Sequence, residues 1–132
     1  GIQTNGDFLV RTLSRKHLDP DLVEKVKKFT EPCIEKYGAD PDIFGKLISG
    51  TMSGDDVSKD WLLCFAVGGK FTNEDGHFNI PRMSSFIGNH PKLASFQAAL
   101  GECNKVTKEN PRETVYEMSF CINEKSPVVL SL

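Results

Sequence analysis

The chain has 132 residues, with 16 lysines and arginines against 18 aspartates and glutamates, so its formal net charge is -2. This length suits one domain, residues 1–132, with a real hydrophobic core. The charge balance argues against nucleic acid or an anionic membrane as the main partner, because both select basic surfaces. The longest apolar run, residues 61–67, is far shorter than the roughly 20 residues that span a bilayer.

The first third of the chain predicts helices. A short helix is expected at about residues 7–14. A longer one is expected from Pro20, which suits the first helical position, with Asp19 as its N-cap. Gly38 ends this helix, and Pro32 should kink it near its C-terminus.

Two further helices are expected before the middle of the chain. Asp40 and Pro41 repeat the start signal, and Gly50 ends this short helix. Residues 54–56 then lead into a helix that is ended by residues 68–69. Its apolar residues cover most of its circumference, which is typical of a central, buried helix.

The second half of the chain continues the helical pattern. Asn79, with a proline two residues later, starts a helix, and residues 89–91 form a break. Another helix is expected over residues 93–103, and the last begins after Asn110. No segment predicts a convincing strand. Residues 126–132 form an apolar tail, which we expect to pack against the rest of the protein.

The four cysteines, Cys33, Cys64, Cys103 and Cys121, are separated by 31, 39 and 18 positions. Zinc sites and redox dithiols use close pairs such as C-x-x-C, and this chain has none. The even count, the spacing and the modest size predict two structural disulfides in a secreted, extracellular protein whose signal peptide has been removed. Four cysteines allow three pairings, and the spacing does not choose among them.

The turn at residues 73–79 is similar to a calcium-binding loop of the EF-hand type, but the match fails. Its first and twelfth ligand positions are occupied by Phe71 and Arg82, where the motif needs carboxylates. We therefore predict no metal site and no cofactor.

The three histidines, His17, His77 and His90, all lie at predicted element ends in polar surroundings. We expect them to be solvent-exposed, and the functional alternative is a pH switch near the entrance of a site. The chain has no nucleophile elbow, no zinc-protease motif and no phosphate-binding glycine loop, so we predict no catalytic residues and no enzyme.

The chain has nine phenylalanines, mostly on the predicted helices. Such residues usually form the core, but aromatic and methionine side chains inside a disulfide-braced helical shell also suit a small apolar guest. Periodicity alone leaves both interpretations open.

Taken together, these features resemble the insect odorant-binding and pheromone-binding proteins, and specifically their four-cysteine, minus-C-like branch. The resemblance rests on the cysteine spacing, on residues 64–81 around the acidic turn and on residues 112–116 before Cys121. It implies an all-α, compact fold of six to seven helices, braced by two disulfides around an internal apolar cavity. It also implies that Cys33 pairs with Cys64 and Cys103 with Cys121.

The family usually has six cysteines, and in this alignment the two missing ones fall on Asp60 and Arg112. We hypothesise that these side chains form an ion pair where relatives have a covalent link. A separation above about 6 Å would contradict this. In an alternative register, Cys64 matches the second family cysteine, which would make the pairing irregular.

The resemblance also implies which residues bind the ligand, with Tyr116 and Ser119 as hydrogen-bond donors and Val128 and Leu130 helping the tail to cover the opening. Residues 1–18 form an N-terminal extension. The implied ligand-binding residues are Leu62, Ala66, Gly69, Phe71, Phe78, Met83, Phe86, Ile87, Phe96, Leu100, Val115, Met118, Ser119, Ile122 and Val129.

The expected function is that of a secreted carrier of a small apolar molecule, an odorant, pheromone or lipid-like compound, without chemical change. A membrane receptor is a further partner that the resemblance suggests, nucleic acid is not, and both a monomer and a weak homodimer remain open. The alternative is a salivary, venom or haemolymph protein on the same scaffold that binds a host macromolecule or bioactive mediator.

Overall fold

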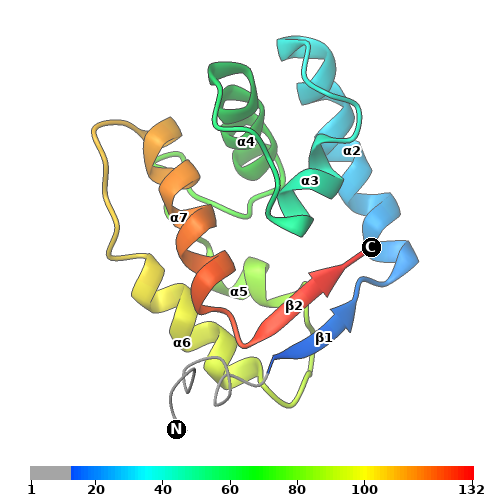
Figure 1. Ribbon diagram of the computed structural model, residues 1–132, viewed down its shortest axis with the longest axis vertical. Coiled ribbons are helices and arrows are strands. Elements are labelled where there is room, and N and C mark those ends of the chain that lie inside the picture. The colour runs from blue at the N-terminus through cyan, green and yellow to red at the C-terminus, as the bar shows by residue number, and fades with distance from the viewer. Residues whose placement is uncertain (1–12) are drawn as a thin grey trace, which may run out of the picture.

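The computed structural model describes residues 13–132, which form helices around a central helix and one small sheet (Figure 1). The predicted helix at residues 7–14 lies outside these residues, except for Leu13 and Ser14. The elements in chain order are β1 (Ser14–His17), α2 (Pro20–Tyr37), α3 (Ile43–Ser49), α4 (Asp56–Gly68), α5 (Ile80–Ser84), α6 (Leu93–Cys103), α7 (Pro111–Lys125) and β2 (Val128–Ser131).

Three helices begin as the sequence predicts, each at an Asp or Asn cap followed by proline. The Asp19 carboxylate accepts a hydrogen bond from the backbone N–H of Asp21. The side chains of Asn79 and Asn110 accept hydrogen bonds from backbone N–H groups three residues further on. Each cap satisfies a donor that the first helical turn leaves without a partner.

Glycines end α2 and α3. Gly38 has φ of 66° and Gly50 has φ of 76°, values that only glycine adopts without strain. The predicted boundaries of both helices are therefore confirmed at their C-terminal ends. α3 begins at Ile43, two residues after the predicted start at Pro41, because Asp40 accepts a hydrogen bond from the Asp42 N–H and forms a turn before the helix.

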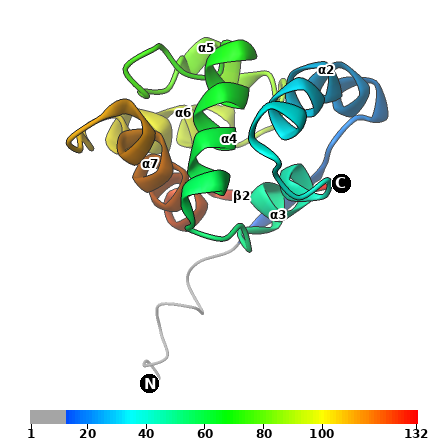
Figure 2. The ribbon, with the colours of Figure 1, turned by 90° about the horizontal axis from the view of Figure 1, so that it is seen from above.

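α4 lies between α2 and α7, as Figure 2 shows from above. Its Trp61 has no exposed surface, and Phe65 is 3% exposed. The indole Nε1 of Trp61 donates a hydrogen bond to the Thr30 carbonyl of α2 over 3.2 Å. The prediction of a central, buried helix is confirmed.

Both disulfides join helices. Cys33–Cys64 links α2 to α4, and Cys103–Cys121 links α6 to α7. This is the pairing that the family resemblance implied, and the alternative register is wrong. All four cysteines are oxidised.

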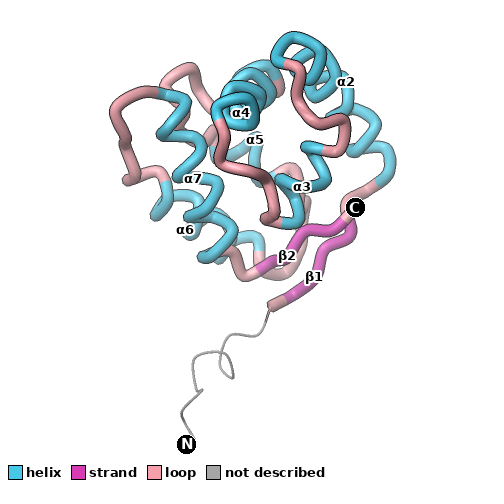
Figure 3. Tube along the Cα trace, turned by 45° about the horizontal axis from the view of Figure 1, so that its top comes forward, coloured by secondary structure: helices cyan, strands magenta, loops and turns pink. Residues whose placement is uncertain are grey.

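The expectation of no strands is wrong. Ser14–His17 and Val128–Ser131 pair as a two-stranded parallel sheet, with Ser14 opposite Val128 and His17 opposite Ser131 (Figure 3). The apolar tail thus packs on the segment that precedes α2 and on the interior, where Val128 is 3% exposed. Among residues 13–132, no helix is long and apolar enough to cross a membrane.

Candidate functional site

A cavity of about 210 Å³ lies between the helices and β2. Its walls come from α3, α4, the segment between α4 and α6, α6, α7 and β2. The lining residues are Phe44, Leu47, Ile48, Ser49, Leu62, Phe65, Ala66, Phe71, Thr72, Phe78, Met83, Phe86, Phe96, Val115, Ser119, Ile122, Asn123, Ser126, Val128, Val129 and Leu130. None of these side chains is charged, and most are apolar.

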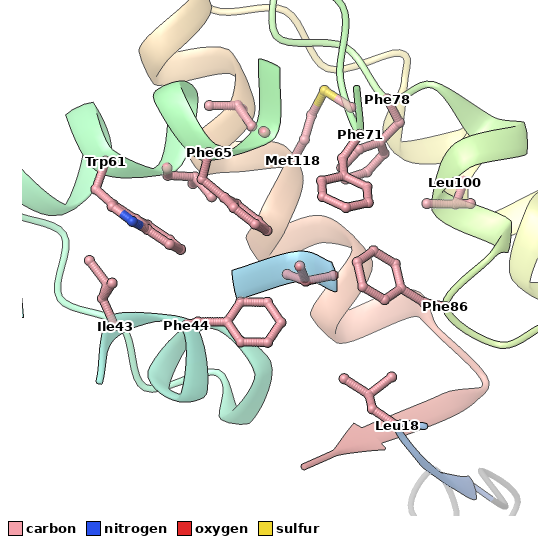
Figure 4. Close-up of a cluster of buried hydrophobic side chains, with 14 of the residues drawn as sticks. Leu18, Ile43, Phe44, Trp61, Phe65, Phe71, Phe78, Phe86, Leu100 and Met118 are labelled. Atoms are coloured by element: carbon pink, nitrogen blue, oxygen red, sulfur yellow. The ribbon is translucent and has the colours of Figure 1, made fainter. Parts of the chain in front are cut away.

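Phenylalanine rings from separate segments form much of this wall. Figure 4 shows Phe44 of α3, Phe65 of α4, Phe71 and Phe86 projecting toward a shared interior. Their ring centroids are close: Phe44 lies 5.6 Å from Phe65, Phe65 lies 5.3 Å from Phe71, and Phe71 lies 5.0 Å from Phe86. Contacts of this kind fix ring orientation in addition to burying area, so they give the wall a defined shape.

The hydroxyl groups along the wall are mostly satisfied within the protein. Ser49 Oγ donates to the Lys46 carbonyl at 3.2 Å, Ser119 Oγ to the Tyr116 carbonyl at 2.6 Å and Ser126 Oγ to the Val128 carbonyl at 2.6 Å. Thr72 Oγ1 is the exception: it is buried and has no partner among residues 13–132.

The turn between α4 and α5 is held from two sides. The Asn73 N–H donates to the His77 carbonyl, and the Asn79 N–H to the Phe71 carbonyl. From the end of α6, the Asn104 amide accepts from the Phe78 N–H at 2.8 Å and donates to the Phe78 carbonyl at 3.1 Å. This part of the cavity wall therefore has a fixed backbone.

The expectation that the histidines are solvent-exposed holds only for His17. His77 is half-buried, with Nε2 2.8 Å from the Val106 carbonyl and Nδ1 3.2 Å from the Asp75 carboxylate. His90 is also half-buried, and its Nδ1 accepts from the Lys92 N–H. A carbonyl and a carboxylate hold the His77 ring in place, and a backbone N–H holds the His90 ring. The polar sequence context does not reveal these contacts. The pKa of Asp75 lies below its usual range because it accepts hydrogen bonds from His77.

A cluster of charged side chains joins α4 to α7 beside the cavity. Arg112 Nη1 lies 3.2 Å from Asp60 Oδ1, and its Nη2 lies 3.4 Å from Asp56 and 3.2 Å from Glu113. Lys59 Nζ lies 2.8 Å from Glu113 Oε1, with both side chains 17% exposed. The hypothesised ion pair between Asp60 and Arg112 is confirmed.

This charged cluster changes the pKa values of its members in consistent directions. The hydrogen bond to Lys59 lowers the pKa of Glu113, and the same bond raises the pKa of Lys59. The hydrogen bond to Asp60 raises the pKa of Arg112. Each shift favours the charged form, so the cluster holds α7 against α4 at neutral pH.

Residues 15–125 match the family model described as the PBP/GOBP family. The chain belongs to this family. Its members are binding proteins that carry small hydrophobic ligands, and they are not enzymes. No curated protein matches the chain in sequence.

A solved structure has a similar fold. A crystal structure of an odorant-binding protein from Locusta migratoria superposes with a TM-score of 0.66 and 19% sequence identity. The match covers 85% of this chain and 87% of the locust chain. At this identity, the likeness supports the all-α fold.

The structure brings most of the residues predicted from the PBP/GOBP resemblance to one cavity. Four lie elsewhere. Ile87, Leu100 and Met118 are at most 2% exposed and belong to the solid core, and the Phe71 ring covers Gly69. Those that line the cavity are Leu62, Ala66, Phe71, Phe78, Met83, Phe86, Phe96, Val115, Ser119, Ile122 and Val129.

Tyr116, predicted as a hydrogen-bond donor to the ligand, does not line the cavity. Its ring packs edge-on against Phe120, with centroids 4.9 Å apart, and its hydroxyl lies over Gly54. Because α7 presents Val115 and Ser119 to the interior, Tyr116 points along the helix surface instead.

Sequence reasoning missed the contribution of α3 and several polar positions. Phe44, Leu47 and Ile48 have the i, i+3, i+4 spacing of one helix face, a signal that was visible in the sequence. Val128 and Leu130 were expected only as cover for the opening, and both belong to the wall. The lining residues missed entirely are Phe44, Leu47, Ile48, Ser49, Phe65, Thr72, Asn123 and Ser126.

Proposed function

We propose that this protein is a secreted carrier that takes up a small hydrophobic molecule, such as an odorant, a pheromone or a lipid-like compound, and releases it unchanged. One observation carries the proposal: a cavity lined by uncharged and mainly apolar side chains, to which β2 contributes Val128, Val129 and Leu130. Family membership supports the same class of function.

The size and chemistry of the cavity favour a small guest. Its volume of about 210 Å³ is below the roughly 300–1,000 Å³ of sites for drug-sized ligands. Each Å² of apolar ligand surface that leaves water contributes about 25 cal/mol, so burial alone gives useful affinity. Residues of one chain form the whole cavity, and the proposal therefore needs no second copy.

The covalent framework supports secretion. Disulfides persist in oxidising compartments and are rare in the cytosol, and this chain has two. Cys103–Cys121 joins α6 and α7, which both line the cavity, and Cys33–Cys64 ties the lining helix α4 to α2, so a guest meets walls whose relative positions are already restrained. Preorganised walls lower the ordering cost of binding.

The test uses displacement of a hydrophobic fluorophore by long-chain alcohols, esters and fatty acids, together with native mass spectrometry for a co-purified guest. Ala66→Phe places a ring in the cavity, and we expect it to weaken binding at least about tenfold, because the guest and the new side chain compete for one space. Ala98→Phe on the exposed side of α6 is the matched control and should bind as the wild type does.

Equal binding by both variants would place the guest outside the cavity. Failure of every apolar probe to bind, with the protein correctly folded by circular dichroism, would reject the carrier proposal. It would favour the alternative of a protein that binds a macromolecule.

A further inference from the structure

We propose that residues 40–52, which comprise α3 and the turns on either side of it, form the door through which a guest enters and leaves the cavity. These residues are called the α3 segment below. The door opens onto a groove on the outer surface between α2 and α3. This inference rests on the proposed function, because it names the route into the same cavity.

The outer groove lies across α3 from the cavity. Its volume is about 530 Å³, and its lining comes from α2, from α3 with Pro41 and Asp42 before it, and from Leu132. Phe44 and Ser49 of α3 line both the groove and the cavity. α3 is therefore the partition between the two spaces, and its displacement joins them.

No hydrogen bond or ion pair ties the α3 segment to the rest of residues 13–132. The Lys46 ammonium pairs with the Asp40 carboxylate, which also accepts from the Asp42 N–H. Ser49 Oγ donates to the Lys46 carbonyl and lies 2.8 Å from the Thr51 hydroxyl. The backbone hydrogen bonds of the segment also join its own residues. The α3 segment can therefore move as a unit and keep its polar contacts.

Apolar packing holds the door shut. Phe44 is 8% exposed, and the centre of its ring lies 5.6 Å from that of Phe65 (Figure 4). The disulfides join α2 to α4 and α6 to α7, so neither reaches α3. The N-cap residue Asp42 makes no side-chain cap, and Gly45 lowers the intrinsic stability of the helix. Segments held in this way open at a lower free energy than the rest of a fold.

The groove gives an apolar guest a surface to rest on before α3 moves. Val23 and Ile34 of α2 and Leu132 bring apolar side chains to it. Apolar molecules leave water for such surfaces. The α2 wall is fixed by the Cys33–Cys64 bond to α4, so α3 is the wall that moves.

An opening at β2 would break hydrogen bonds, which an opening at α3 does not. The Leu18 N–H donates to the Ser131 carbonyl at 2.7 Å, and the Ser14 N–H donates to the Pro127 carbonyl at 3.1 Å. β1 pairs with β2 along its whole length. Backbone groups that lose such partners need new ones, so the route past α3 has the lower barrier.

Gly45→Phe obstructs the groove without entering the cavity. Gly45 lines the groove and not the cavity, and a Cβ at this position meets only Leu132 Cδ1, at 3.5 Å. Stopped-flow mixing with the fluorophore N-phenylnaphthylamine measures the rate constants of association and dissociation. We expect both to fall by at least about fivefold and by the same factor, because an obstacle on the route raises the barrier in both directions. The dissociation constant should stay within about twofold of the wild-type value, since neither end state changes.

A smaller side chain at the same position guards against misfolding of the phenylalanine variant. Gly45→Leu should slow both rate constants by a smaller common factor, and circular dichroism checks the fold of each variant. Gly101→Phe is the matched control. Gly101 lies in α6, lines neither the groove nor the cavity, and an added Cβ there meets no atom within 4 Å. The same change in helix propensity away from the route should leave both rate constants unchanged.

A rival route passes between α3 and α7. A hollow of about 30 Å³ there shares Leu47, Ser119 and Asn123 with the cavity. Phe120 also lines this hollow and is 44% exposed. Phe120→Ala widens it and should leave both rate constants unchanged if the guest passes through the groove.

Four results would overturn the inference. These are unchanged rate constants in both Gly45 variants, equal slowing by Gly101→Phe, faster exchange in Phe120→Ala, and weaker binding by Gly45→Phe with an unchanged association rate constant. In each case the fluorophore still binds the wild type, and the proposed function stands. If the wild type binds no apolar probe, both the inference and the proposed function fail.

Discussion

The central helix α4 has two neighbours that hold it by different means. Toward α2, it is joined by the Cys33–Cys64 bond and by the hydrogen bond from Trp61. Toward α7, it is held by apolar packing and by the partly exposed charges around Arg112. A covalent bond keeps its partners together at any pH or salt concentration, whereas an exposed ion pair does not. The contact between α4 and α7, which borders the cavity, is therefore the one whose strength changes with pH and salt; it is called the adjustable contact below.

The largest effect should come from removing the covalent contact. Cys33→Ser combined with Cys64→Ser should lower the free energy of unfolding by about 3–4 kcal/mol, because the unfolded chain loses a constraint over 31 positions. Urea denaturation measures this change in the free energy of unfolding. Removing the Cys103–Cys121 bond, which spans 18 positions, should lower the free energy of unfolding by slightly less. If removing either disulfide lowered the free energy of unfolding by less than about 1 kcal/mol, the disulfides would not be the main braces of the fold.

A covalent bond introduced at the adjustable contact should stabilise the protein. Asp60→Cys combined with Arg112→Cys restores the family's missing pair, and we expect a gain of about 1–3 kcal/mol in the free energy of unfolding. The control is Asp60→Ser with Arg112→Ser, which removes the charges without adding a bond. Mass spectrometry detects the new disulfide by its loss of two hydrogen atoms. Two free thiols in the purified variant would show that the geometry does not permit this disulfide.

Neutralising Arg112 should weaken the same contact mildly. Arg112→Gln leaves Asp56 and Asp60 without their cation, so the melting temperature should fall by about 2–4 °C at low ionic strength. The difference should shrink in high salt, where charges are screened. Lys125→Gln on the last turn of α7 is the control. A salt-independent loss would mean that Arg112 acts through packing of its aliphatic part.

The smallest effect concerns acid pH. The pKa of Glu113 is lowered by Lys59, so its contribution to stability is present above the ordinary pKa of a glutamate and is lost as pH falls through the lowered value in the folded protein. Glu113→Gln should therefore be less stable than the wild type at pH 7, and the gap should narrow as pH falls below the ordinary pKa of a glutamate. Glu117→Gln, an exposed position on the same helix, is the control. A gap that is constant with pH would contradict the sign of the shift.

Helix boundaries were predictable because their signals are local. The caps at Asp19, Asn79 and Asn110 and the stop at Gly38 depend on residues within one turn of each other. Strand β1 was not predictable in the same way. Its partner β2 lies more than 100 positions away, and a four-residue polar segment has no strand pattern of its own.

The candidate site was predictable only in part, because local sequence patterns show which residues are apolar but not which of them face the cavity. α4 and α7 carry lining residues at positions that match a family pattern, and most of these meet at the cavity. The short helix α3 was overlooked, although Phe44 and Leu47 belong to its inner face. Leu100 and Met118 have the same apolar character as lining residues, yet both are fully buried in the core. Which apolar residues face a hollow and which fill the core depends on how helices pack in three dimensions.

The sequence by itself determined the helices, the presence of two crosslinks and the family, because caps, cysteine count and motif spacing are read along the chain. The tertiary structure alone decided that β2 forms part of the cavity wall and that Lys59 of α4 pairs with Glu113 of α7. It also decided that Thr72 retains an unpaired hydroxyl at the wall. These features join residues distant in sequence, and their energies depend on distances and burial that no local pattern encodes.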